Sequence, residues 1–358
     1  MKTIIIGDRK IGKDYPPFIV AEMSGNHNQS LSHALKLVDA AAAAGVHALK
    51  IQTYTPDTMT IDSGRKEFFI RDPKNPWAGD SLYNLYKKAY TPWKWHKKIF
   101  SRCKKLGLTA FSTPFDLTAV DYLESLGVPC YKIASFENID IPLIKKAASK
   151  HKPLIISTGL ASKKDISEAI AAAKSAGCKD IVLLKCTSAY PAEAKDANLL
   201  TIPFMSRNFD CLAGLSDHSE GIGAALASIS LGSCLIEKHF TLSRNDGGVD
   251  SSFSLEPHEM KMLVKESKRA WESLGRVSFK LSEQEERSKL YRRSLYAVKD
   301  IGAGERFTAE NVRSIRPALG LPPKNYDKII GKTARKNISM GTPLRRDLIL
   351  NKKRPIIK

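Results

Sequence analysis

The sequence lacks the features that mark membrane-spanning and exported proteins. Its 358 residues contain no apolar run approaching the roughly 20 residues that a membrane-spanning helix needs. In residues 1–8 only Ile4, Ile5 and Ile6 form an apolar stretch, which is too short for a signal peptide. We therefore expect a cytoplasmic protein that makes no contact with a membrane.

Paired cysteine motifs are also absent. None of the six cysteines stands in C-x-x-C spacing, which argues against a zinc knuckle and against a dithiol redox site. We expect them to be reduced core residues. The six are Cys103, Cys130, Cys178, Cys186, Cys211 and Cys234.

Acidic residues are scarce, with 37 Asp and Glu against 57 Lys and Arg, which gives a formal net charge of +20. Such a balance is typical of nucleic-acid-binding proteins, but it also suits a protein with anionic substrates. The lysines are scattered over predicted helices and do not gather in one patch interleaved with aromatic residues. We therefore expect no nucleic-acid partner, although the substrates alone do not require so large a charge.

Eight short, β-rich apolar runs alternate with helical patterns, which predicts βαβ units and a parallel sheet. Eight such units in about 250 residues match the size of a (β/α)8 TIM barrel. An open doubly wound sheet normally has a glycine-rich phosphate turn after its first strand, and residues 21–28 contain none. We therefore predict an α/β barrel. The predicted strands are residues 18–23, 48–53, 108–112, 130–134, 154–157, 181–186, 212–216 and 234–240.

The connection over residues 54–107 is longer than a usual βα crossover and is rich in aromatic residues. It follows a strand, so it begins at the catalytic face of a barrel. A lid over the substrate and a side excursion with its own small core both agree with this composition.

The C-terminal part contains an internal repeat. Residues 334–341 repeat the pattern of residues 297–304, at an offset of 37 positions. We predict a barrel over residues 1–280, a linker over 281–292, a small domain over 293–352 and a basic tail over 353–358. A domain of about 60 residues is at the lower margin of independent stability, so we expect it to lean on the barrel or on a partner subunit.

Polar side chains lie at the ends of almost all the predicted strands. Barrel enzymes build their active sites at this face from several strands at once. Lys50 and Lys132, with Ser112, Thr113, Ser135 and Ser157, suit a phosphorylated ligand, because ammonium groups and hydroxyls bind phosphate.

Two histidines end the predicted seventh and eighth strands. Imidazoles of His218 and His239 suit a divalent metal ion, and two protein ligands leave positions open for water and substrate. Asp217 and Glu237 alternate with these histidines, so we expect supporting or structural roles for both.

These residues resemble the sialic acid synthase family over nearly the whole chain. The stretches that carry the resemblance are residues 21–27, 48–52, 131–137, 157–159, 214–218 and 236–241. The C-terminal repeat resembles the family's antifreeze-like (SAF, β-clip) domain. The resemblance implies a phosphoenolpyruvate-condensing synthase with a barrel, a domain-swapped homodimer, and a divalent cation such as Mn²⁺, Mg²⁺ or Co²⁺.

The resemblance also implies roles for individual residues. The implied phosphoenolpyruvate pocket comprises Lys50, Thr113, Lys132, Ser135, Ser157 and Ser216, with Ser188 where family members often have Asn. The implied metal ligands are His218 and His239, and Arg316 would reach the partner subunit's site to contact the amide group of the sugar. The residues expected to face the sugar are Glu22, Gln52, Tyr190 and Asp250. Glu22 and Glu137 are our candidates for positioning or deprotonating the reacting water.

Residues 21–28, 81–86, 135–138 and 292–296 resemble the branch of the family that makes pseudaminic acid. The implied acceptor is the amino sugar 2,4-diacetamido-2,4,6-trideoxy-altrose. The alternatives are a synthase of N-acetylneuraminate or legionaminate, a metal aldolase that does not use phosphoenolpyruvate, and a carbohydrate-binding module with a degenerate barrel.

Overall fold

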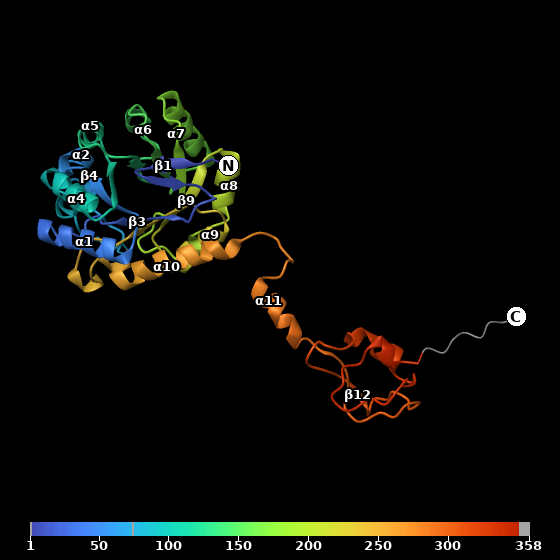
Figure 1. Cartoon of the computed structure of the whole chain (residues 1–358). Coiled ribbons are helices and arrows are strands. Elements are labelled where there is room, and N and C mark those ends of the chain that lie inside the picture. Colours follow the sequence, from blue (N-terminus) through green and yellow to red (C-terminus); the bar gives the residue numbers. More distant parts are fainter. Residues whose placement is uncertain (1, 74, 351–358) are drawn as a thin grey trace. The chain divides into compact units, whose positions relative to one another are not determined.

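The computed structural model describes residues 2–73 and 75–350. The chain divides into two compact units between Gly275 and Arg276 (Figure 1). The predicted basic tail lies outside the described residues, and the predicted linker over residues 281–292 stays a prediction. In the described part of the chain, no helix combines the length and the apolar character needed to cross a membrane.

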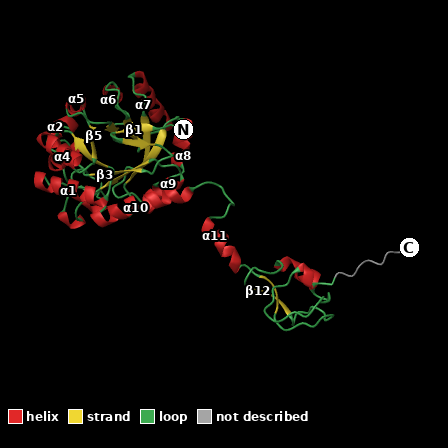
Figure 2. Ribbon diagram, in the orientation of Figure 1, coloured by secondary structure: helices red, strands yellow, loops and turns green. Residues whose placement is uncertain are grey.

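The first unit is a closed barrel of eight parallel strands, which confirms the predicted fold class. The strand order around the barrel is β10-β3-β4-β5-β6-β7-β8-β9 (Figure 2). The barrel strands are β3 (Phe18–Glu22), β4 (Ala48–Thr53), β5 (Thr109–Pro114), β6 (Tyr131–Ile133), β7 (Leu154–Ser157), β8 (Ile181–Cys186), β9 (Leu212–Asp217) and β10 (Leu235–His239).

Helices surround the barrel, and side-chain caps begin several of them. Ser30 accepts a hydrogen bond from the His33 backbone N–H at the start of α1, and the Asp116 carboxylate does the same for two amides of α5. The barrel helices are α1 (Leu31–Ala44), α4 (Trp93–Lys105), α5 (Leu117–Ser125), α6 (Ile141–Ala148), α7 (Lys163–Ser175), α8 (Thr201–Asn208), α9 (Gly223–Ser230) and α10 (Pro257–Leu274). Short 3-10 helices are η1 (Lys66–Phe68), η2 (Ala194–Asp196), η3 (Arg244–Asp246), η4 (Ser251–Phe253), η5 (Lys289–Tyr291), η6 (Pro323–Asn325) and η7 (Arg346–Leu348).

The long connection between β4 and β5 has two parts. Its second part is α4, which packs on α1 and β5 as an ordinary crossover helix. The extra structure is therefore confined to the part before α4, which contains α2 (Pro56–Met59), η1 and α3 (Leu82–Ala89).

A hairpin that the sequence analysis did not anticipate closes the bottom of the barrel. It consists of β1 (Ile4–Ile6) and β2 (Arg9–Ile11), paired antiparallel. Its inward isoleucines join one buried cluster with Phe18, Val20 and other inward residues of the barrel strands. Because side chains alternate along a strand, the residue two positions after each inward residue of a barrel strand also faces the interior.

The second unit has a core of its own and is built from the sequence repeat. The Gly304 N–H donates to the Ala334 carbonyl, and 37 positions on, the Gly341 N–H donates to the Ala297 carbonyl. Both glycines have positive φ, at 85° and 84°, a conformation that strongly favours glycine. The two copies therefore pair reciprocally around one cluster. The regular elements here are α11 (Glu283–Ser288), β11 (Ser294–Ala297), β12 (Val312–Ile315) and α12 (Tyr326–Ile329).

Candidate active site

Strand alternation brings polar side chains from different strands into the mouth of the barrel. Phe18 and Val20 of β3 belong to the interior cluster, so Glu22 on the same strand follows them inward. On the other barrel strands too, every second side chain faces the interior. The buried polar residues that share this parity are Glu22, Lys50, Thr113, Lys132, Ser157, Ser216, His218, Glu237 and His239.

Lys50 is the centre of a buried ionic network. Its Nζ lies 2.9 Å from Glu22 Oε2 and 3.4 Å from Glu237 Oε1, and it donates to Thr113 Oγ1 at 3.1 Å. Burial disfavours the charged amine, but the two carboxylates raise the pKa of Lys50 above its ordinary value. Lys50 therefore stays protonated in the barrel interior.

Lys132 lies among hydroxyl groups that suit an anion. Its Nζ donates to Ser157 Oγ at 2.6 Å. A Cβ placed on Gly159, just after Ser157, would lie 2.6 Å from Ser135 Oγ and 2.2 Å from Ser188 Oγ, so both hydroxyls pack directly over this glycine. Burial lowers the pKa of Lys132, which no carboxylate contacts within the described residues. An anionic ligand would therefore supply the missing counter-charge.

Electrostatic coupling links the two lysines to the two histidines. Burial alone would raise the pKa of Glu237, but Lys132, Lys50 and His218 lower it below its ordinary value. Burial and the charges of His218, Lys50 and Lys132 lower the pKa of His239 well below its ordinary value. All four basic side chains thus belong to one buried polar cluster at the barrel mouth, and His239 is a neutral imidazole.

The geometry of the two histidines fits a metal ion. Their ring centroids are 5.2 Å apart, and His218 Nδ1 lies 2.9 Å from the Thr187 carbonyl oxygen, which leaves Nε2 available. Over the described residues, His239 Nδ1 is buried without a hydrogen-bond partner, 3.8 Å from Asp250 Oδ2. The same residues include no group of three or more His, Cys, Asp and Glu side chains placed to hold a metal. The two imidazoles therefore suit a site that water and substrate complete.

Aromatic side chains cover the imidazoles. The Tyr190 ring centroid lies 4.4 Å from that of His218 and 5.3 Å from that of Phe253. Trp77, from the extra structure after β4, lies 5.8 Å from Tyr190, and its indole N–H donates to the Val249 carbonyl at 2.9 Å. The insertion therefore reaches the site, which favours a lid over a separate side excursion.

The residues expected to face a sugar form a connected polar chain. Gln52 Nε2 donates to Glu22 Oε1 at 2.9 Å and to Ser24 Oγ at 3.0 Å. The Ser24 hydroxyl donates in turn to Asp250 Oδ2. These groups lie on the side of the barrel where β3 neighbours β10 and β4. Arg316 is exposed in the second unit, at the end of β12.

Asp217 and Glu237, which the sequence pattern placed together, have different surroundings. Asp217 points away from the interior and pairs with Lys238 at 2.9 Å, and this lysine also donates to the Ser219 and Gly221 carbonyls. Glu237 shares the parity of His239 and accepts from Ser216 at 3.4 Å. The sequence analysis therefore missed Glu237 as a central residue. Glu237 lies two positions before His239 on one strand, and this spacing could have shown that both side chains face the same way.

Cys186 is a second residue that the sequence analysis did not single out. It is a free, buried thiol at the end of β8, and its Sγ lies 3.8 Å from His218 Nδ1. Burial would raise its pKa, but the hydrogen bond and charge of His218 lower it to about 7. No spacing motif marks it, because its partner is distant in sequence.

An eight-stranded parallel barrel with buried lysines and paired imidazoles at the carboxyl ends of its strands has the architecture of a (β/α)8-barrel enzyme. The chain belongs to the NeuB family, whose model matches residues 37–279. The SAF domain model matches residues 292–350. The family recognition from sequence motifs is therefore confirmed.

Relatives of known name extend over almost the whole chain. A pseudaminic acid synthase from Helicobacter pylori is 41% identical over 333 residues, covering 93% of this chain and 97% of that protein. An N,N'-diacetyllegionaminic acid synthase from Campylobacter jejuni is 37% identical and covers 89% of this chain and 96% of that protein. The crystal structure of an N-acetylneuraminic acid (sialic acid) synthetase from Leptospira borgpetersenii in complex with citrate has a TM-score of 0.71 and 33% identity. It covers 80% of this chain and 95% of that chain.

Glu137 generates a pH-dependent prediction. Burial raises its pKa to about 7, although Lys132 opposes this shift. The native state therefore holds the proton more tightly than the unfolded chain, so the contribution of Glu137 to stability falls as pH rises from about 4.5 to about 7. Glu137→Gln should gain stability relative to wild type by roughly 1–3 kcal/mol between pH 4 and pH 8, since the amide cannot ionise.

Thermal or urea unfolding at both pH values measures this difference. Glu168→Gln, at an exposed carboxylate of α7, is the matched control. A stability difference between Glu137→Gln and wild type that is the same at both pH values would contradict the shifted pKa.

Proposed function

We propose that this enzyme condenses phosphoenolpyruvate with 2,4-diacetamido-2,4,6-trideoxy-altrose and water, giving pseudaminic acid and phosphate. The 41% identity to a pseudaminic acid synthase over 93% of the chain supports the choice of product. The observation that carries the chemistry is the position of Lys50, Lys132, His218 and His239 as buried, inward-facing side chains on the strands of one closed barrel, with the two imidazole centroids 5.2 Å apart.

Phosphoenolpyruvate would bring a phosphate and a carboxylate to these side chains. Lys132, with Ser157, Ser135 and Ser188, offers a cation and hydroxyl donors to one anionic group. Lys50 and Thr113 face the same interior from the neighbouring strands β4 and β5. Ser216 completes the proposed set. Amines already fixed by buried partners cost little reorganisation when charge moves during reaction.

His218 and His239 are the proposed metal ligands, with Mn²⁺, Mg²⁺ or Co²⁺ as the candidate ions. When bound, the ion would act as a Lewis acid on the aldehyde oxygen of the open-chain acceptor. The Thr187 carbonyl orients the His218 ring, and burial keeps His239 neutral. Burial would lower the pKa of His218, but Cys186 raises it above its ordinary value, so metal binding there would displace a proton from the imidazole.

The chain's own residues then manage charge and protons. Carbon 3 of phosphoenolpyruvate forms a bond to the aldehyde carbon, and water adds at carbon 2. Glu137, with a pKa raised to about 7 by burial, is suited to take the proton of that water, and Glu22 is the second candidate. The former aldehyde oxygen takes up one proton and becomes a hydroxyl, so the proton removed from water is balanced. Loss of phosphate from the tetrahedral intermediate leaves the keto acid, while Lys50 and Lys132 balance the departing charge.

The sugar would lie beneath Tyr190 and along Gln52, Glu22 and Asp250. We further propose a domain-swapped homodimer in the cytoplasm, in which the exposed Arg316 of each second unit reaches the site of the partner subunit and contacts the amide group of the sugar. An exposed guanidinium with planar donors suits recognition of a carbonyl oxygen.

Phosphate release separates this function from its alternatives. With phosphoenolpyruvate and Mn²⁺, we expect release with the altrose-derived acceptor to exceed release with N-acetylmannosamine and with the legionaminate precursor sugar by at least about tenfold in kcat/KM. Preference for another acceptor would reassign the enzyme within its family. Carbon–carbon bond formation without phosphate release would indicate a metal aldolase, and the absence of both ligand binding and turnover would support a carbohydrate-binding module.

Metal removal tests the histidine assignment. Exhaustive EDTA treatment should abolish turnover, and added Mn²⁺ should restore it, because the aldehyde then regains its Lewis acid. His218→Ala should lose metal binding, measured by calorimetry, together with turnover. His33→Ala, at a histidine on the outer helix α1, is the matched control. Normal turnover by His218→Ala, or full activity after EDTA, would refute the assignment.

A further inference from the structure

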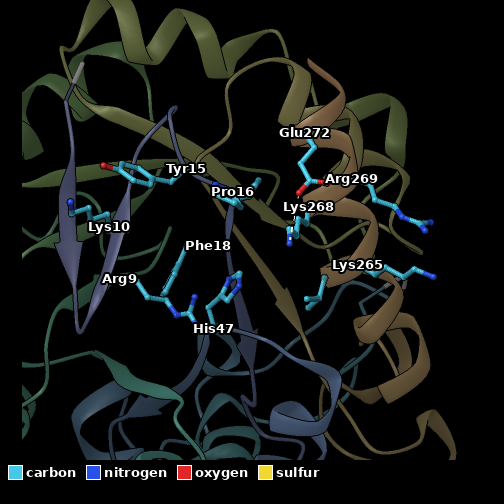
Figure 3. Close-up of a pocket in the computed structure, with 12 residues that line it drawn as sticks. Arg9, Lys10, Tyr15, Pro16, Phe18, His47, Lys265, Lys268, Arg269 and Glu272 are labelled. Carbon is cyan, nitrogen blue, oxygen red and sulfur yellow. Dashed lines mark ion pairs between the residues drawn. The ribbon is translucent and has the colours of Figure 1, made fainter. Parts of the chain in front are cut away.

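The opposite end of the barrel contains a second cavity. Its volume is about 730 Å³, and it lies between the β1–β2 hairpin, the start of β3 and helix α10 (Figure 3). Phe18, which lines it, begins β3, whereas Glu22 of the active site ends the same strand. The two sites are therefore roughly 13 Å apart along this strand and do not overlap.

The lining of this cavity is strongly basic. Within the described residues, Arg9, Lys10 and Lys265 have no carboxylate within ion-pair distance, whereas Lys268 lies 3.7 Å from Glu272 and Arg269 lies 3.0 Å from Glu266. Like charges at close quarters destabilise the folded state unless an anion offsets them. The lining residues that carry charge are Arg9, Lys10, Lys265, Lys268, Arg269 and Glu272.

Two of the cations face the cavity from opposite sides. In Figure 3 the Arg9 guanidinium extends from the hairpin toward His47, while Lys268 extends from α10 on the other side. Lys265 and Arg269 lie on the outer rim, where their long side chains can turn toward a ligand. Burial and the nearby Arg9 charge lower the pKa of His47 to about 4, so the imidazole adds no charge of its own.

The floor and one wall of the cavity are fixed by packing. The His47 ring stacks on Phe18, with centroids 5.7 Å apart and planes 21° apart, and its Nδ1 accepts from the Ile19 backbone N–H at 2.9 Å. Trp271 of α10 donates to the Lys13 carbonyl at 3.1 Å, which ties the helix to the segment between the hairpin and β3. The cavity is therefore preformed, with flat side chains at its base.

We propose that this cavity binds a phosphate-bearing small molecule. Arg9 matches the bidentate geometry of a phosphate, and Lys268 with Lys265 on the rim adds point charges. His47 and Pro16 offer a flat surface to a planar group, so a nucleotide is the organic ligand that fits best. The site would also account for part of the net charge that the catalytic substrates leave unexplained. It does not rest on the proposed reaction.

Calorimetric titration of the metal-free, full-length enzyme tests the proposal with two probes. Tripolyphosphate reports the phosphate chemistry, and ATP reports whether a nucleotide supplies it. We expect tripolyphosphate to bind with a Kd below about 1 mM, and ATP to bind more tightly if its ring contacts the floor. Binding of tripolyphosphate alone would assign the site to free polyphosphate.

Four variants locate the binding. Arg9→Gln combined with Lys268→Gln should weaken it at least about tenfold, while Lys104→Gln with Lys105→Gln, an equal charge change on the exposed face of α4, should leave it unchanged. Glu272→Gln should tighten it about threefold by removing the nearby negative charge. Lys132→Met, in the barrel mouth, should at most remove a separate binding step at the active site and should leave the binding step of this cavity unchanged.

The proposal fails if neither probe binds below about 1 mM, or if the α4 pair weakens binding as much as the cavity pair. It also fails if Lys132→Met abolishes binding, because the anion then occupies the active site. An oligonucleotide of about ten nucleotides that binds tenfold more tightly than ATP would indicate a nucleic-acid surface instead. Normal phosphate release from phosphoenolpyruvate by the cavity variants would show that catalysis is a separate property.

Discussion

The buried network around Lys50 is the interaction on which the site depends. Glu22 of β3 and Glu237 of β10 hold the amine from one side of β4, and Thr113 of β5 completes its contacts from the other side. An unpaired ammonium group at this depth would lose several kcal/mol of solvation or give up its proton. The carboxylates keep Lys50 charged before any substrate arrives. Lys132 has no such partner in the described part of the chain and burial lowers its pKa, so an incoming anion would supply the charge that keeps this amine protonated.

The closed barrel explains how residues far apart in sequence form this network. Each strand contributes inward side chains at every second position, and parallel pairing aligns their carboxyl ends. The hairpin fills the bottom of the interior with isoleucines, so the polar residues occupy only the upper layers. Aromatic side chains from the insertion and the loops then limit water at the imidazoles.

Much of the barrel and its site was predictable from sequence, because strands and helices leave a local pattern of apolar residues. The eight strands were recognisable as short apolar runs, and the lysines and histidines stood at their ends. Two residues of the site were not predicted from the sequence. The sequence analysis treated Glu237 like Asp217, although only Glu237 faces the barrel interior on the same side of its strand as His239. Cys186 belongs to the site through a contact with His218, which is 32 positions away in sequence. The β1–β2 hairpin is too short for a periodic signal, since each strand has three residues.

The most direct test of the account is to measure how tightly the enzyme binds phosphoenolpyruvate with and without the Lys132 amine. Calorimetric titration of phosphoenolpyruvate should give a Kd about a hundredfold weaker for Lys132→Met than for wild type, because a charged hydrogen bond in a buried site is lost. Lys104→Met, at an exposed lysine of α4, should bind like wild type. If Lys132→Met binds phosphoenolpyruvate as tightly as wild type does, the polar cluster at the barrel mouth is not the anion site, and the account is wrong.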